Sequence, residues 1–230
     1  VVGSGIAGLV LALELADSGK VIVLTKRAAE ITNTGLAQGG IAAAWQGQDS
    51  WQAHVQDTLV AGAGLCRREV VERVARAAKG RVEALIALGC RFDQQDGEYD
   101  LHREGGHSGR RILHAKDRTG AEIMRALLQA VSAHPAIEVR EHRMVVDLIT
   151  EGWVARSRGE LPPAPDRVIG LYALNTNTGE VETYAGRAVA LCTGGAGKVY
   201  LYTSNPDVAS GDGVAIAYRA GARVANMEFV

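Results

Sequence analysis

Six residues near the start of the chain have the types and spacing to bind the diphosphate of a dinucleotide. Gly3-Ser4-Gly5-Ile6-Ala7-Gly8 has the form G-x-G-x-x-G, and helical periodicity follows over residues 9–17. The first glycine of such a turn permits a tight bend, the second lets a pyrophosphate approach the backbone, and the third lets helix and strand pack closely. The anion then lies against N–H groups at the positive end of the helix. We therefore predict dinucleotide binding here, against the alternative of an ordinary glycine-rich turn.

The strand that follows narrows the choice of dinucleotide. Residues 21–24 form an apolar run typical of a buried parallel strand, and Thr25-Lys26 comes directly after it. A plain NAD site carries Asp or Glu at that point, to bind a ribose hydroxyl. The residues present therefore favour FAD, or an unusual ribose contact. Lys26 is predicted at the adenosine end of the ligand, with an ordinary solvated lysine as the alternative.

Two further glycine-rich segments are predicted to approach a ligand. Residues 33–44 are small and polar around Gln38-Gly39-Gly40, which predicts a loop with an exposed backbone. Thr193 and Gly194 follow an apolar strand predicted over residues 189–192, and a glycine at the end of a parallel strand allows close approach to a cofactor. Val145 and Val146 lie in another predicted strand, and one of the two is expected to offer backbone groups to adenine at the strand edge.

The remaining elements must position these segments. Helices are predicted over residues 68–78 and 81–88, and residues 90–111 are predicted to be a loop rich in His, Arg and Glu. Residues 119–122 match a capping box, and the helix after it is predicted to end before Pro135. Further strands are predicted over residues 137–141, 144–149, 168–174 and 180–184, and a short helix over 214–220. The order predicts an α/β fold: a Rossmann-like parallel sheet with helices on both faces and an inserted β-meander.

Composition excludes several classes of partner. The 230 residues are 47% hydrophobic and carry a net charge of −1, so we expect a packed core and no nucleic-acid partner. No apolar run is long enough to cross a bilayer, so no membrane partner is expected. The three cysteines are widely spaced, which favours a reducing compartment such as the cytoplasm, and Cys192 is predicted to be buried. No metal-ligand spacing is recognisable, so no metal is predicted.

Seven blocks in order resemble the flavoprotein family of succinate dehydrogenase, fumarate reductase and L-aspartate oxidase, over almost the whole chain. The blocks are residues 3–8, 37–43, 103–108, 110–115, 117–120, 193–196 and 210–213. The resemblance implies FAD as the cofactor. The residues implied or predicted to bind FAD are Gly3, Ser4, Gly5, Ile6, Ala7, Gly8, Lys26, Asn33, Thr34, Gly35, Leu36, Ala37, Gln38, Gly39, Gly40, Val146, Thr193, Gly194 and Asp212.

Two positions make the chain resemble the L-aspartate oxidase branch of this family. Asn33 stands where membrane-complex members carry a histidine bonded to FAD, so the resemblance implies non-covalent FAD. Glu104 lies where the branch carries a carboxylate for the substrate ammonium, and a carboxylate within about 4 Å would complement that cation. The alternative is that Glu104 pairs with Arg103, Arg110 or Arg111. His107 and His114 are predicted either to shape the site or to be structural.

The resemblance implies FAD-dependent oxidation of L-aspartate to iminoaspartate, with oxygen or fumarate as electron acceptor. The product would pass to quinolinate synthase, in NAD biosynthesis. The alternatives are a soluble fumarate reductase or succinate dehydrogenase flavoprotein, a non-catalytic FAD-binding fragment, and a flavin-dependent RNA-modifying protein.

The ends of the chain suggest a piece of a longer polypeptide. The chain begins at Val1 with little strand before the glycine turn, and residues 224–230 are an apolar, strand-like run. We expect residues 1–230 to be one FAD-binding domain that ends where a capping domain would begin. The resemblance places further Arg and His residues of the active site beyond Val230, so the isolated piece is expected to bind FAD poorly and to be inactive.

Overall fold

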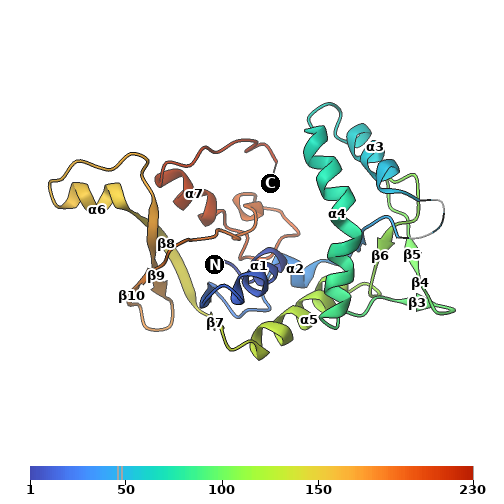
Figure 1. Cartoon of the computed structure of the whole chain (residues 1–230), viewed down its shortest axis with the longest axis horizontal. Helices are drawn as coiled ribbons and strands as arrows, with labels where there is room; N and C mark the ends of the chain where they lie inside the picture. Colours follow the sequence, from blue (N-terminus) through green and yellow to red (C-terminus); the bar gives the residue numbers. More distant parts are fainter. Residues whose placement is uncertain (46, 48, 230) are drawn as a thin grey trace. The chain divides into compact units, whose positions relative to one another are not determined.

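The computed structural model describes residues 1–45, 47 and 49–229. The chain divides into two compact units, one made of Val1–Asn33 with Leu128–Val230 and the other of Thr34–Leu127. Each unit is described separately below, with the element labels of Figure 1.

The first unit contains a small parallel sheet that ends at the glycine turn. β1 (Val21–Leu24) pairs in parallel with β7 (Ile137–Arg140), as the apolar pattern predicted. Val2 forms parallel bridges to Leu24 on one side and to Leu191 on the other. The predicted strand at 189–192 is therefore reduced to a single bridge. Cys192 is half-buried, so the prediction of a buried thiol was wrong.

The helix after the glycine turn packs on this sheet. α1 (Ile6–Ala16) contacts β1 and β7, and it begins three residues earlier than its periodicity predicted. Its residues Leu9, Ala12 and Ala16 are buried. The glycine turn is therefore bonded to the carboxyl end of β1, and α1 packs against β1 and β7.

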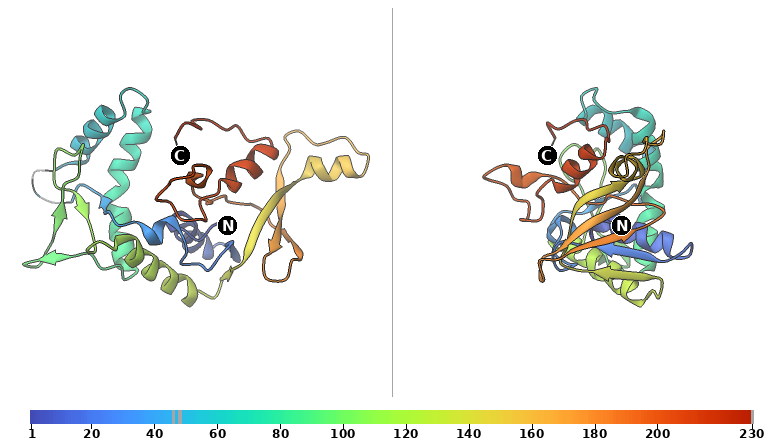
Figure 2. Two further views of the ribbon diagram at one scale, coloured as in Figure 1. Left: turned by 180° about the vertical axis from the view of Figure 1, so that it is seen from behind. Right: turned by 90° about the vertical axis from the view of Figure 1, so that its left-hand side faces the viewer.

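The predicted β-meander is inserted after β7. β8 (Arg143–Thr150), β9 (Val168–Asn175) and β10 (Val181–Ala185) form an antiparallel sheet in the order β10-β9-β8. The Asn175 carboxamide accepts hydrogen bonds from the N–H groups of Asn177 and Thr178, which closes the predicted hairpin. α7 (Asp212–Arg219) lies beside β8 in Figures 1 and 2 and contacts it.

One apolar core joins the parallel strands, the meander and α7. Its buried members are Val2, Leu24, Val145, Leu171, Ala173 and Ile216. Two elements of this unit were not predicted: α6 (Glu151–Ser157), which Thr150 caps through the Trp153 N–H, and a 3-10 turn, η1 (Gly197–Val199). Residues 224–229 form no strand, contrary to the prediction from their apolar composition.

The second unit is built from helices and short strands. α3 (Trp51–Ala61) and α4 (Arg68–Ala87) pack side by side (Figure 1). The two helices predicted at 68–78 and 81–88 are thus one helix, because a single glycine inside a helix costs only about 1 kcal/mol. α3 was missed, although Ser50 caps it by accepting the Ala53 N–H. The predicted loop regions contain α2 (Asn33–Leu36), β2 (Ile41–Ala42), β3 (Gln94–Gln95), β4 (Glu98–Tyr99), β5 (Leu101–His102) and β6 (Ile112–Leu113).

The predicted capping box at residues 119–122 does not form. Thr119 is the first residue of α5 (Thr119–Ala133), and its hydroxyl accepts a hydrogen bond from the Ala115 N–H. The Glu122 carboxylate instead accepts the Arg91 N–H and binds Arg125. The Glu122 side chain, which would have capped the helix, is therefore engaged by the backbone of Arg91 instead. The helix does end before Pro135, as predicted.

Across the part of the chain that the structure describes, every helix is too short or too polar to cross a membrane.

Candidate cofactor-binding site

The first and third glycines of the turn are required by close backbone contacts. Gly3 has φ +108°, and a Cβ built on it would lie 2.2 Å from the Cys192 carbonyl oxygen. A Cβ on Gly8 would lie 1.9 Å from the Gly3 carbonyl oxygen. Any side chain at either position would therefore push the turn, the helix and the neighbouring strand apart.

The amino-terminal end of α1 lacks a side-chain cap. Gly5 is its N-cap residue, and the first turn contains no acidic side chain. The positive end of the helix dipole is therefore not offset by a carboxylate of its own first turn, which suits an anionic ligand. The Ser4 hydroxyl is buried and lies 2.9 Å from the Ala29 carbonyl oxygen and 3.1 Å from the Thr25 hydroxyl. Ser4 can therefore serve a ligand through its backbone only.

Two residues predicted from separate motifs meet at the end of β1. The Lys26 ammonium lies 2.6 Å from the Asp212 carboxylate and 2.6 Å from the Ser210 hydroxyl. Burial acts to raise the pKa of Asp212, but hydrogen bonds from Lys26 and Ser210 and the Lys26 charge outweigh it, so the pKa is lowered. The Asp212 carboxylate is therefore ionised at neutral pH. Asp212 is also the first residue of α7, where a carboxylate is favourable.

Thr193, Gly194 and Asn33 also come together in the first unit. Gly194 has φ +70°, and a Cβ on it would lie 3.7 Å from the Asn33 side-chain nitrogen. Thr193 packs against Gly213, where a Cβ would lie 1.7 Å from the Thr193 hydroxyl oxygen. Asn33, which is predicted to bind FAD, thus lies next to Gly194.

Val146 is the predicted residue that joins none of these groups. It lies at a register shift of β8, between Val145 and Asp147, which pair with β9. Its carbonyl oxygen accepts a hydrogen bond of 2.6 Å from Arg219. The Val146 carbonyl is therefore already engaged within the protein.

In the second unit, residues 34–40, which belong to the segment predicted to bind FAD and are called the flavin loop below, are held in place by α5 and β6. A Cβ on Gly120 would lie 1.7 Å from the Thr34 carbonyl oxygen, and the Gly120 N–H donates to Ala37. A Cβ on Gly40 would lie 2.2 Å from the Ile112 side chain. The backbone of this loop is thus fixed by contacts that only glycine permits. Its residues 36–40 are exposed.

Glu104, the predicted substrate residue, lies against this loop. A Cβ on Gly39 would be 3.5 Å from the Glu104 carboxylate. The Glu104 side chain is exposed, and within residues 1–45, 47 and 49–229 no cation forms an ion pair with it. Arg110 donates instead to the Leu101 carbonyl, and Arg111 binds two aspartates. The alternative that Glu104 is neutralised by an arginine of its own loop was therefore wrong.

A buried ion-pair network in the second unit was not predicted from the sequence. Arg111 is fully buried and forms a two-point contact of 2.9 and 2.7 Å with Asp49, and a contact of 2.8 Å with Asp57. A backbone hydrogen bond from Ser108 is the main cause that lowers the pKa of Asp57, with smaller contributions from the Ser108 hydroxyl and Arg111. His107 Nδ1 lies 3.5 Å from the Arg111 guanidinium, which supports a structural role for this histidine.

Gly120 and Gly213 were also missed as site residues. Both belong to blocks that carry the family resemblance, at residues 117–120 and 210–213. For Gly213 the available signal was its place next to Asp212, but only the structure shows what each glycine contacts.

Comparisons with known proteins agree with this geometry. The sequence matches the FAD binding domain family over residues 1–230. L-aspartate oxidase of Yersinia pestis is 50% identical, over 100% of this chain and 43% of that protein. The chloroplastic L-aspartate oxidase of Arabidopsis thaliana is 46% identical, over 100% of this chain and 34% of that protein. The chain thus spans less than half the length of these curated relatives.

Solved structures confirm the fold class. Quinol fumarate reductase of E. coli superposes with a TM-score of 0.85 at 31% identity, over 95% of this chain and 36% of that one. The open conformation of a flavocytochrome c3 fumarate reductase gives a TM-score of 0.81 at 25% identity, over 96% of this chain and 40% of that one.

The residues present fit FAD. Gly3 and Gly8 leave no room for side chains, and the helix that follows offers an uncapped positive end for a diphosphate. With the match over its whole length, the chain belongs to the FAD-binding domain family, and FAD is its cofactor.

Proposed function

We propose that the full-length protein containing this chain oxidises L-aspartate to iminoaspartate. Bound FAD supplies the hydride acceptor. The carboxylate of Glu104 supports this proposal, because it is exposed, has no cation paired with it in the described part of the chain, and lies against Gly39 of the flavin loop. Such a carboxylate can bind the α-ammonium of an amino acid and so orient the α-carbon. The names of the curated relatives support the same substrate.

We also propose the electron acceptor, the enzyme that receives the product and the compartment. Oxygen or fumarate would reoxidise the flavin, and iminoaspartate would pass to quinolinate synthase for NAD biosynthesis. The likeness to fumarate reductases supports fumarate as one acceptor. The free cysteines Cys66, Cys90 and Cys192 support a reducing compartment, for which we propose the cytoplasm.

Glu104→Gln is expected to lower kcat/KM for L-aspartate selectively. A carboxylate–ammonium contact at about 4 Å is worth roughly 1 kcal/mol in water and roughly 4 kcal/mol at an effective dielectric constant of about 20, or about 5- to 1000-fold. Steady-state release of ammonia from L-aspartate by the full-length holoenzyme measures the effect. Glu98→Gln, which changes an exposed carboxylate of β4, is the matched control and should leave kcat/KM unchanged. Equal activity of the Glu104 variant and the wild type would refute the role of Glu104.

A soluble fumarate reductase or succinate dehydrogenase flavoprotein is the second candidate, since solved fumarate reductases share the fold at a TM-score of 0.85. That enzyme would oxidise succinate, release no ammonia from L-aspartate, and respond little to Glu104→Gln. A non-catalytic FAD-binding fragment would turn over neither substrate. An RNA-modifying protein would retain tRNA in a filter-binding assay.

We also propose that FAD is held without a covalent bond. Asn33 occupies the position of the histidine that links FAD in some relatives by resemblance, and a carboxamide cannot form that bond. Acid precipitation of the yellow holoprotein is therefore expected to leave the flavin in the supernatant. Colour that stays with the precipitated chain would contradict this prediction, and the same assay on free FAD mixed with albumin is the control.

A further inference from the structure

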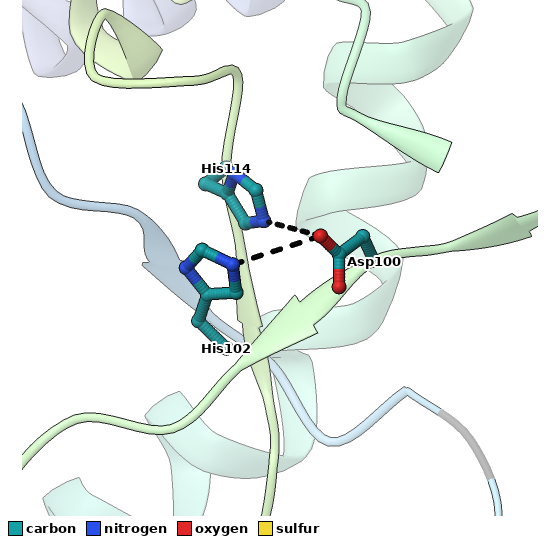
Figure 3. A group of neighbouring side chains, drawn as sticks. All are labelled: Asp100, His102 and His114. Atoms are coloured by element: carbon teal, nitrogen blue, oxygen red, sulfur yellow. Dashed lines mark ion pairs between the residues drawn. The ribbon is translucent and has the colours of Figure 1, made fainter. Parts of the chain in front are cut away.

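Three potential metal ligands lie on one face of the β5–β6 ribbon in the second unit. Asp100 and His102 flank Leu101, so the two-residue period of a strand turns both to the same face. Leu101 pairs with Leu113, which places His114 opposite Asp100 and therefore on that face as well. Figure 3 shows one nitrogen of each imidazole directed at the same Asp100 carboxylate oxygen.

The separations suit a cation better than they suit hydrogen bonds. His102 Nε2 lies 3.6 Å and His114 Nε2 lies 3.5 Å from Asp100 Oδ2. Hydrogen bonds between such groups are about 2.7–3.2 Å long. Ligand atoms bound to tetrahedral Zn²⁺ at about 2.0–2.2 Å are about 3.3–3.5 Å apart. One ligand atom from each of the three residues lies within 4.8 Å of the other two.

His114 is a buried histidine whose ring nitrogens lack hydrogen-bond partners in the described part of the chain. Its side chain is 8% exposed, and neither ring nitrogen makes a hydrogen bond within the described residues. Its Nδ1 lies 3.3 Å from the Asp93 carboxylate, which also accepts the Lys116 N–H at 2.7 Å. A carboxylate behind the far nitrogen of a histidine is the usual outer partner of a metal ligand, because it directs the Nε2 lone pair toward the metal.

We propose that Asp100, His102 and His114 bind one divalent transition-metal ion, with Zn²⁺ as the best match. Two imidazole nitrogens and one carboxylate oxygen are a donor set that Zn²⁺ accepts, and three protein ligands leave a fourth position for water. The side chains of His102 and Asp100 are 53% and 35% exposed, so an ion can enter from solvent. The bound ion would tie β5 to β6 just before the loop that carries Glu104.

Binding requires one small adjustment. The rings of His102 and His114 are stacked, with centroids 3.6 Å apart and planes at 25°. A metal lies in the plane of each imidazole that binds it, so one ring must turn. His102 is the exposed partner and can rotate in nanoseconds or less, whereas His114 is held by its burial and by Asp93.

Zn²⁺ titration of the chelator-treated full-length holoprotein tests the proposal. A competing chromophoric chelator is expected to report one equivalent of tightly bound Zn²⁺, with a rise in Tm as it binds. Asp100→Asn and His102→Gln should each weaken binding more than 100-fold. Asp93→Asn should weaken it 10- to 100-fold, as loss of an outer partner does.

His142→Asn is the matched control. It removes a histidine outside the cluster, at a position with φ +59° that asparagine tolerates, and should leave Zn²⁺ binding unchanged. Asp100 and His102 lie at or near the surface, so their variants are expected to fold, and circular dichroism checks this. Wild-type protein that binds no Zn²⁺ equivalent, or variants at Asp100 and His102 that bind as tightly as wild type, would overturn the proposal. Neither outcome depends on turnover of L-aspartate.

Discussion

Gly8→Ala is expected to weaken FAD binding by the full-length protein severely. The new Cβ would lie 1.9 Å from the Gly3 carbonyl oxygen, which is backbone and cannot turn aside. Relief requires α1 to move away from the strand, and this movement breaks the turn that presents N–H groups to the diphosphate. We expect at least 100-fold weaker binding in a titration of apoprotein with FAD. Overpacking should also lower the free energy of unfolding by about 1–3 kcal/mol in urea denaturation.

Gly80→Ala is the matched control, because it makes the same change in a helix where the new Cβ meets no atom within 4 Å. It should leave FAD binding unchanged and stabilise the protein by up to about 1 kcal/mol. If Gly8→Ala bound FAD within about threefold of the wild-type affinity, the role given to the glycine turn would be wrong.

Arg111→Leu is expected to lower the free energy of unfolding by about 3–5 kcal/mol, the usual effect of removing one partner from a buried ion pair. Arg111 is fully buried, and its loss would leave Asp49 and Asp57 unpaired with side chains 8% and 16% exposed. Two neighbouring carboxylates would then repel each other with little water to solvate them. Urea denaturation of the holoprotein measures the change.

The neighbouring Arg110 is the natural control. It is exposed and, among the described residues, donates a hydrogen bond of 2.7 Å to the Leu101 carbonyl, so Arg110→Leu should cost no more than about 1 kcal/mol. Adding Asp49→Asn and Asp57→Asn to Arg111→Leu should recover part of the lost stability, because the unpaired charges are removed. Equal losses for Arg110→Leu and Arg111→Leu would show that the network does not act as a buried ion pair.

Features encoded over a few neighbouring residues were predicted correctly. The glycine turn, the strand at β1, the hairpin closed by Asn175 and the end of α5 each depend on local backbone preferences. Helix α3 escaped prediction because it buries only Val55 in its apolar positions, so its periodicity is weak. The capping box does not form because the Glu122 carboxylate binds the Arg91 N–H and the Arg125 guanidinium and not the helix end.

The sequence by itself determined the cofactor family and the α/β class, because the spacing of Gly3, Gly5 and Gly8 specifies a turn that few other structures need. Only the tertiary structure decided which charges meet. Arg111 binds Asp49, which lies 62 positions away in the sequence. His114 lies opposite Asp100 because of the register of two antiparallel strands. Local periodicity carries no information about such pairings, since burial and strand register are set by the whole fold.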